Sequence, residues 1–331
     1  MIRALLATIR FALLPLAVGL AVFWAGAALW FDGAALPTAS FAIAAVAVVA
    51  AIRPFHRALL VLIALVAVVL SWWLSLPPSN DRDWQPDLAH PAVATIDGDQ
   101  LTVRNVRNFH YRSETDYDAH WEERTYDLSK LQGADFFMSY WGSPWIAHTI
   151  VSWDFGDGEH LAISIETRKE EGEAYSAILG FFRQFELYYV VADERDVIGL
   201  RTNQRGEDVY LYRLNAEPEL VRAVLLDYLE EINRLAEQPE WYNAATHNCT
   251  TTIDHHVQHV AKGTRPWDWR ILLNGSLDQM GYENGTVMTG GLPFETLRAR
   301  GAVSERAREA EVGPDYSARI RSGLPNAGGS P

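Results

Sequence analysis

The sequence predicts an α+β domain placed behind three N-terminal transmembrane helices. Long uncharged, apolar runs fill most of residues 1–77, whereas the rest of the chain mixes charged and apolar residues. In this second part, short strand patterns interrupted by glycine come first and helical patterns come later. We therefore divide the chain into a membrane anchor at 1–77, a linker at 78–91, one domain at 92–318 and a flexible tail at 319–331.

Three segments of the anchor are long enough to cross a bilayer. They run from Phe11 to Trp30, from Leu36 to Ile52 and from Ala58 to Leu76, and contain 20, 17 and 19 residues without a charge. Each is near the length that spans about 30 Å of hydrocarbon, and the second is the weakest because it is short. A cleaved secretory signal would carry one such segment rather than three in series.

Basic residues set the predicted orientation of the anchor. Arg3 and Arg10 precede the first helix, the loop at 31–38 holds no Lys or Arg, and the loop at 53–57 holds two Arg. Because loops rich in Lys and Arg stay in the cytoplasm, the N-terminus is predicted to be cytoplasmic. Three crossings then place everything after Leu76 outside the cytoplasm.

The chain beyond residue 77 is strongly acidic. It carries 24 Lys and Arg against 41 Asp and Glu, a net charge of −17. Such a surface excludes nucleic acid as a partner and disfavours a broad electrostatic contact with anionic lipid. Cys249 is the only cysteine in the sequence and cannot form an internal disulfide. A lone thiol in an oxidising compartment indicates that its chemistry is needed.

The outer domain has several predictable elements. Strands are expected at 92–97, 100–108, 124–127 and within FFRQFELYYV at 181–190, and helices at 220–237 and from about Cys249 to Val260.

The segment from His148 to Arg168 predicts a β-hairpin whose register is set by its apolar residues. The odd-numbered positions are the apolar ones on both strands, including Trp153 and Leu161. Facing residues share one side of a sheet, so odd positions must pair with odd positions. A three-residue loop at 156–158 provides this register and places His148 opposite Glu166. A two-residue turn would bury polar residues instead.

His148, Glu166 and Cys249 form the candidate catalytic set. A carboxylate facing a histidine across two strands is within reach of the ring and can orient it as a base. A structural His/Glu pair on the solvent side would look the same in the sequence. Cys249 favours the catalytic interpretation because Thr246 or Asn248 can cap a helix that begins at the thiol. The helix dipole would favour the thiolate, and free first-turn N–H groups could receive an oxyanion.

Four histidines lie near Cys249 and raise the alternative of a metal site. His255 and His259 are one helical turn apart, but the glutamate of an HExxH motif and a second cysteine are both missing. We expect no metal and no cofactor, with His255, His256 and His259 solvated or packed. His247 is a candidate for substrate contact only.

Further candidates for substrate binding are Tyr242 and Asn248, beside the cysteine, and two arginines. Arg195 and Arg201 belong to an arginine-rich stretch at 193–214 and could hold a carboxylate or a phosphate. The more frequent outcome is a set of salt bridges with nearby acids, here Glu194, Asp196 and Asp208.

Several runs in one order resemble a known family. They are HTIVSWDF with LAISIETRKEEGEAYS, ELYYVVADERDVIGLRT with VYLYRL, YNAATHNCTTTI and GLPFETLRARG. Over residues 132–301 the chain resembles the periplasmic domain named after the Lnb lipoprotein N-acyltransferase. That family is similar to permuted papain-like thiol enzymes of the NlpC and lecithin:retinol acyltransferase kind, in which the histidine precedes the cysteine. His148 before Cys249 agrees with this order, and the third triad position falls on Glu166.

The resemblance implies acyl transfer at the periplasmic face of a bacterial inner membrane. In the Lnb reaction, an ester-linked acyl chain of a diacylglyceryl lipoprotein moves to the N-terminal amine of the lipid-bearing cysteine. The implied partner is a membrane lipid or a lipoprotein, and the implied intermediate is a thioester on Cys249. Two alternatives stay open: a cysteine hydrolase of the cell envelope, and a non-catalytic membrane-tethered module that binds lipid or wall fragments.

Overall fold

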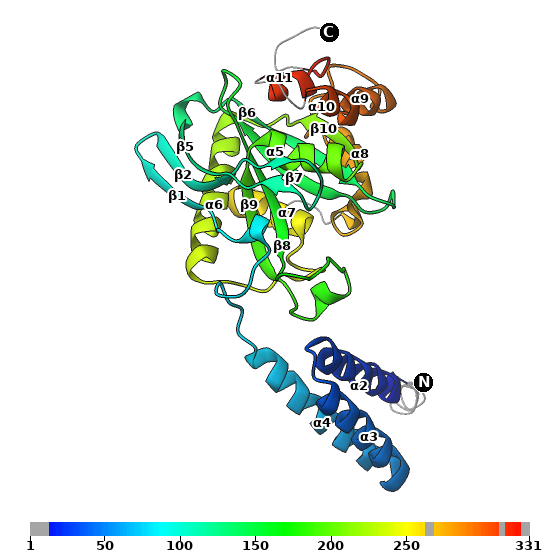
Figure 1. Cartoon of the computed structure of the whole chain (residues 1–331). Coiled ribbons are helices and arrows are strands. Elements are labelled where there is room, and N and C mark those ends of the chain that lie inside the picture. The colour runs from blue at the N-terminus through cyan, green and yellow to red at the C-terminus, as the bar shows by residue number, and fades with distance from the viewer. Residues whose placement is uncertain (1–12, 262–267, 311–314, 326–331) are drawn as a thin grey trace. The chain divides into compact units, whose positions relative to one another are not determined.

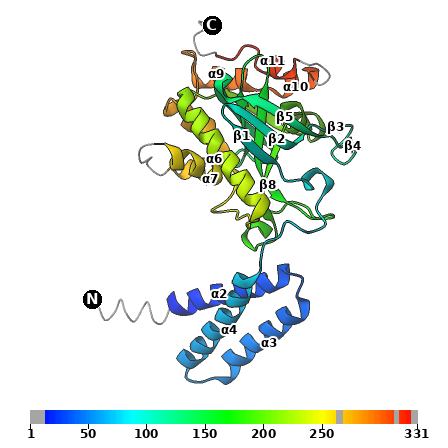
Figure 2. The same cartoon turned by 90° about the vertical axis from the view of Figure 1, so that its left-hand side faces the viewer.

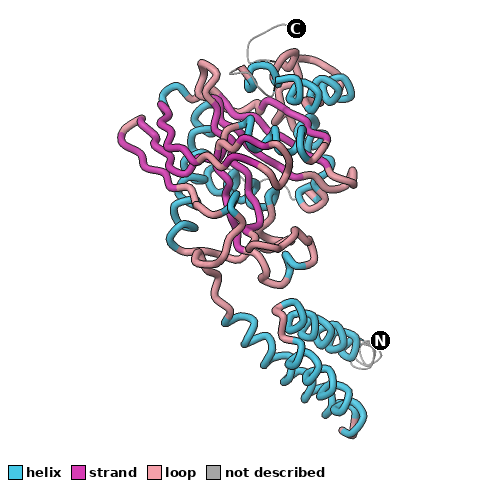
Figure 3. The backbone as a smooth tube through the Cα atoms, viewed as in Figure 1, coloured by secondary structure: helices cyan, strands magenta, loops and turns pink. Residues whose placement is uncertain are grey.

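The computed structural model describes residues 13–261, 268–310 and 315–325. The chain forms two compact units. One comprises the residues up to Pro78 together with Phe181–Gln184, and the other comprises the rest of the chain. Figure 3 shows helices joined by loops in the N-terminal part and both strands and helices in the remainder.

Three apolar helices build the first unit: α2 (Leu14–Phe31), α3 (Ala35–Ala51) and α4 (Phe55–Ser75). They are coloured in blue shades in Figure 1. By length and composition α2 and α4 could cross a membrane, whereas α3, with 17 residues, is a shorter apolar helix. Two apolar spans are thus supported, and the three-crossing topology remains a prediction. The short segment 181–184 groups with these helices through Arg183, whose Nη1 donates to the carbonyl of Trp73 at 2.8 Å.

The second unit is organised around one eight-stranded sheet. Its order is β1-β2-β9-β8-β7-β6-β10, with β5 paired to the other side of β2. All pairs are antiparallel except β2 and β9, which are parallel. The strands are β1 (Val93–Asp97), β2 (Gln100–Arg107), β5 (Trp121–Asp127), β6 (Gly133–Tyr140), β7 (His148–Asp154), β8 (His160–Arg168), β9 (Glu186–Ala192) and β10 (Asp208–Arg213). A separate pair is formed by β3 (His110–Tyr111) and β4 (Tyr117–Asp118).

The hairpin of β7 and β8 has the register that its apolar pattern predicts. Trp153 pairs with Leu161, and the N–H of Phe155 donates to the carbonyl of Glu159 at 3.0 Å. Gly156, Asp157 and Gly158 all have positive φ in the three-residue loop. Two glycines make this conformation accessible because they carry no Cβ.

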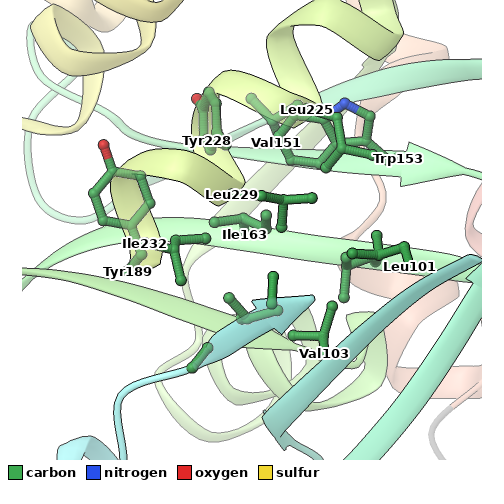
Figure 4. Packing of buried hydrophobic residues seen from close by; sticks show 14 of the residues in the cluster. Leu101, Val103, Val151, Trp153, Ile163, Tyr189, Leu225, Tyr228, Leu229 and Ile232 are labelled. Carbon is green, nitrogen blue, oxygen red and sulfur yellow. The ribbon is translucent and has the colours of Figure 1, made fainter. Parts of the chain in front are cut away.

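Helices cover one face of the sheet through the odd-numbered residues of the hairpin. These helices are α6 (Pro218–Glu237), which lies across the sheet in Figure 2, and α7 (Cys249–Val260). Figure 4 shows Leu225 and Leu229 of α6 over Val151 and Ile163. Helix α6 begins two residues before the predicted start, and α7 has the predicted bounds.

The opposite face of the sheet is also buried. It packs against α5 (Glu194–Gly199), α10 (Ser304–Ala310) and α11 (Tyr316–Ile320), while α8 (Leu277–Glu283) and α9 (Phe294–Gly301) lie beside β6 and β10. Buried ion pairs hold this layer, because Arg321 reaches both Glu194 and Asp135. The even-numbered face of the hairpin is therefore not a solvent face.

Three expectations need correction. The run at 181–190 becomes a strand only from Glu186, since Phe181–Gln184 leaves the sheet and joins the helical unit. The predicted tail at 319–331 starts too early, because Arg319 belongs to α11 and Arg321 is buried in ion pairs; residues 326–331 lie outside the described part. The linker at 78–91 is packed onto the domain, where Leu88 is buried and Asn80 bonds the end of α6.

Candidate active site

His148 and Glu166 lie together at the open end of the β7–β8 hairpin. Continuing the hairpin register places them opposite each other, and His148 Nε2 is 3.2 Å from Glu166 Oε1. Ser164, two residues before Glu166 on the same face, joins the two groups. Its hydroxyl is 2.7 Å from His148 Nε2 and donates to Glu166 Oε1 at 2.7 Å. The histidine thus presents one nitrogen to a carboxylate and a hydroxyl and keeps Nδ1 for another partner.

Cys249 is the first residue of α7, as its capping signals predict. Asn248 is the N-cap: its side chain accepts from the N–H groups of Thr250 and Thr251, and the hydroxyl of Thr251 accepts from the N–H of Asn248. This reciprocal pair is a capping box, and it fixes the point at which the helix starts. Thr246, the other N-cap candidate, does not take this role. The thiol therefore lies at the positive end of the helix dipole.

The thiol and the imidazole interact directly, together with Thr149. Burial alone would raise the pKa of Cys249, but His148 and hydrogen bonds from the side chain and backbone of Thr149 lower that pKa to about 7. Burial would likewise lower the pKa of His148, but Glu166 and Cys249 outweigh it and raise that pKa to about 9. These opposite shifts favour the thiolate–imidazolium form of the pair over the neutral form.

The first turn of α7 offers fewer free donors than the sequence suggests. The N–H groups of Thr250 and Thr251 are both donated to the Asn248 side chain. Within the described residues, the backbone N–H of Cys249 itself has no acceptor. It is the first-turn donor that remains for an oxyanion on a carbonyl attacked by the sulfur.

Arg201, expected to bind substrate, instead forms a buried charge network with Glu166 and Glu207. Arg201 lies on the π-helical turn Leu200–Gln204, and its two terminal nitrogens bond Glu166 at 2.6 Å and Glu207 at 3.3 Å. Glu207 also accepts from Ser139. Burial alone would raise the pKa of Glu166, but His148 and Arg201 hold it well below the usual range. The Glu166 carboxylate therefore stays ionised.

Asn274 joins the strand that carries the histidine to the helix that carries the cysteine. Its side-chain amide donates to the carbonyl of Ala147 and to Thr250 Oγ1, both at 2.6 Å, and its oxygen accepts from the N–H of Ala147 at 2.8 Å. A Cβ on the next residue, Gly275, would meet the carbonyl oxygen of Pro144 at 2.1 Å. Residues 274 and 275 thus fix the spacing of the site, and no local pattern marks them in the sequence.

The other predicted contact residues divide into two groups. Tyr242 is buried beside Cys249, where its hydroxyl bonds that of Tyr175. His247 is exposed and bonds Thr246, and the side chain of Asn248 is occupied by capping. Arg195 is directed elsewhere, to Asn108 at 2.6 Å and His110 at 3.3 Å.

Arg195, Arg201 and Arg205 do not pair with the expected acids Glu194, Asp196 and Asp208. Glu194 bonds Arg321, and Asp196 bonds Arg107. Arg205 instead bonds Glu114 at 2.9 Å. Salt bridges therefore form in this stretch, but not with the expected acids: Arg201 pairs with Glu166 and with the nearby Glu207.

The histidines of α7 are bound to protein groups. His256 is buried, with Nδ1 2.6 Å from Asp227 and Nε2 2.6 Å from the hydroxyl of Tyr189. His259 Nδ1 also bonds Asp227, and the ring of His255 stacks on that of His259. Over the described ranges, no group of three or more His, Cys, Asp or Glu residues is arranged to hold a metal ion.

Comparison with known proteins identifies the region that contains this site. Residues 117–275 match the family described as the Lnb N-terminal periplasmic domain. The matched region includes His148, Glu166 and Cys249, and it ends at the Asn274–Gly275 step. No curated protein and no solved structure matches the chain.

Proposed function

Since residues 117–275 match the Lnb N-terminal periplasmic domain family, we propose that this membrane-anchored periplasmic protein is a thiol-dependent acyltransferase. Cys249 would be its nucleophile, His148 its general base and acid, and Glu166 the group that orients His148. The observation that supports this most strongly is the contact between His148 and the thiol of the first residue of α7, together with Glu166 3.2 Å from the imidazole. The proposed fold relationship to permuted papain-like enzymes rests on the same order of residues.

The first half of the reaction forms a thioester. The Cys249 thiolate attacks the carbonyl carbon of an acyl ester, and the resulting oxyanion is received by the N–H of Cys249. The carbon–oxygen bond of the ester then breaks. The leaving alkoxide takes the proton of His148 Nδ1, which leaves a neutral imidazole beside the thioester.

The second half transfers the acyl chain to an amine. An amine nitrogen attacks the thioester carbonyl, and the neutral His148 accepts the proton that the nitrogen loses. The carbon–sulfur bond breaks and restores the thiolate and the imidazolium. We propose the N-terminal amine of a lipoprotein as the acceptor, and an ester-linked chain of a lipid or lipoprotein as the donor.

The membrane topology belongs to the same proposal. Three crossings by α2, α3 and α4, with the N-terminus in the cytoplasm, would place the domain in the periplasm, where lipoprotein N-termini are found. A phosphatase fused to the C-terminus should then be active outside the cytoplasm, and an inactive fusion would contradict this topology.

Product analysis of the purified full chain tests the reaction. A diacyl lipopeptide is incubated with the protein in detergent, and the products are sequenced by fragmentation mass spectrometry, with the Cys249→Ala chain as control. Transfer within one lipopeptide leaves the intact mass unchanged and moves one acyl chain to the N-terminal nitrogen. Release of free fatty acid without N-acylation would identify a hydrolase. No turnover by a folded wild-type chain, with full cellular function of Cys249→Ala, would identify a binding module.

A further inference from the structure

Exposed apolar side chains of the sheet-containing unit are concentrated in three loops. In the described part of this unit, nine large hydrophobic side chains are exposed, and eight of them lie in the loops at 141–147, 174–180 and 268–275. The ninth is Ile96, at the end of β1. A folded surface normally distributes exposed hydrophobic residues singly, so such a concentration marks a contact surface.

Two of these loops are packed against each other along their backbones. The N–H of Gly275 donates to the carbonyl of Trp145 at 2.9 Å. The Asn274 side chain accepts from the N–H of Ala147 and donates to its carbonyl. Together the loops expose six large apolar side chains, which we name the apolar rim: Trp141, Trp145, Ile146, Trp269, Leu272 and Leu273.

The apolar rim borders the catalytic residues directly. The loop at 141–147 ends at the residue before His148, and Asn274 bonds Thr250, the residue after Cys249. The third loop also reaches the site, because Tyr175 bonds Tyr242 next to the thiol and Ile178 of the same loop is exposed. Exposed apolar residues thus gather where a substrate must reach the sulfur.

The composition of the rim fits the boundary of a lipid bilayer. Tryptophan is enriched at membrane–water interfaces because its ring is apolar and its N–H is polar. The chain beyond residue 77 has a net charge of −17, so overall electrostatic attraction does not bring the domain to anionic lipid. The exposed apolar side chains can contact the membrane without such attraction. The chain also leaves α4 at Ser75 and enters the domain at Ser79, so a membrane spanned by α4 is only a few residues away.

We propose that the apolar rim inserts into the outer leaflet of the membrane that the N-terminal helices cross, so that the thiol meets its substrate at the lipid surface. The occupant of the rim is the bilayer interface itself, rather than a protein partner or a second copy of the chain. The proposal concerns where the domain docks and stands apart from which reaction Cys249 performs.

Spin labels on the full chain test this placement. In a Cys249→Ala background, single cysteines replace Ile146, Leu272 or Ile96, and the labelled chains are reconstituted in phosphatidylcholine vesicles. Ile96 is the matched control, because it is 46% exposed where Ile146 is 47% exposed and lies outside the three loops. Accessibility of each label to oxygen, which partitions into lipid, is compared with accessibility to a water-soluble nickel complex.

We expect labels at 146 and 272 to be several-fold more accessible to oxygen than to nickel, and the label at 96 to show the reverse. A Trp145→Glu replacement in the chain labelled at 146 should shift that label towards nickel accessibility, whereas Trp145→Phe should not. Aqueous signals at all three positions would overturn the proposal. So would dipolar broadening between labels at 146, which would show that a second copy covers the rim. None of these readouts requires turnover, so failure of the proposed reaction leaves the test intact.

Discussion

Two buried histidines near opposite ends of α7 have similar partners but pKa values shifted in opposite directions. His148, beside the start of α7, has a carboxylate and a hydroxyl at Nε2, and its pKa is raised to about 9. His256, near the end of α7, has a carboxylate at Nδ1 and a hydroxyl at Nε2, yet burial lowers its pKa below the usual value. Both rings have a carboxylate partner, but Glu166 is the largest contribution that raises the pKa of His148, whereas burial outweighs Asp227 at His256.

The partner of the remaining ring nitrogen adds to this difference in pKa. At His148 it faces the Cys249 thiol, which becomes an anion and needs a proton on the imidazole. At His256 it faces Tyr189, whose pKa burial raises well above the usual range, so the hydroxyl keeps its proton and donates it. His256 is then a neutral bridge between Asp227 and Tyr189, packed under Tyr228 with ring centroids 4.0 Å apart. One histidine is suited to proton transfer and the other to anchoring the helix.

Removal of each histidine should separate these roles most strongly. We expect His148→Gln to lower kcat/KM by at least about 10³-fold with little change in stability, because the thiolate loses its counter-ion and the leaving group its acid. His256→Gln should lower stability but keep kcat within about tenfold. Thermal unfolding and steady-state kinetics on both variants check this. If His148→Gln and His256→Gln lost the same activity and were equally stable, the two histidines would not have different roles.

Glu166→Gln should give the next largest effect. Without the carboxylate, the pKa of His148 falls and the ring loses its orienting charge, so kcat should drop by about 10²- to 10⁴-fold while KM changes little. Glu207→Gln is the matched control, because Glu207 also bonds Arg201 but does not touch His148. A rate for Glu166→Gln close to that of the wild type would remove Glu166 from the catalytic set.

The pH dependence of kcat/KM should reflect the ion pair. Activity is expected to rise through about 7 as Cys249 becomes a thiolate and to fall through about 9 as His148 loses its proton. The two groups interact, so both limbs belong to the pair. In Glu166→Gln the alkaline limb should move to lower pH. A profile that stays flat from pH 6 to 10 would contradict an ion-pair nucleophile.

Asn274→Ala should cost less, about tenfold in kcat/KM, because it loosens the spacing of His148 and Cys249 without removing either group. Asn274→Asp is a useful companion, since it keeps the acceptor for the Ala147 N–H and loses the donors to Ala147 and Thr250. Rates are compared with thermal stability in both variants. A loss of stability with unchanged rate would make Asn274 structural only.

The predictable parts of the site depend on local rules, and the unpredicted parts depend on tertiary contacts. The hairpin register follows from alternation and loop length, and the start of α7 follows from Asn248 as N-cap. Arg201 and Asn274 reach the site from 35 and 24 residues away along the chain, from Glu166 and Thr250 respectively. The arginine-rich stretch singles out Arg201, but no local pattern shows that Arg201 contacts Glu166 or that Asn274 contacts Thr250. For the same reason the hairpin pattern does not indicate the burial of the even-numbered sheet face, which depends on α10 and α11.

The smallest effect concerns the pH dependence of stability. Between pH 7 and 9 the His148–Cys249 pair holds one proton when folded, on the imidazole, and one when unfolded, on the thiol, so it adds no slope there. His256 is different because its lowered pKa keeps it neutral in the folded chain while the unfolded chain binds a proton below about pH 6.5.

Its contribution to stability is therefore complete above about pH 6.5 and lost as pH falls towards its folded pKa, by at most about 1.4 kcal/mol per pH unit. Asp227, Glu231 and His255 also act on His256, so the wild type must be compared with a His256→Gln chain over the same range. Chemical denaturation at pH 5 and pH 7 should show the wild type losing more stability than the variant. Parallel curves would mean that His256 is charged in the folded protein, and the contrast with His148 would then disappear.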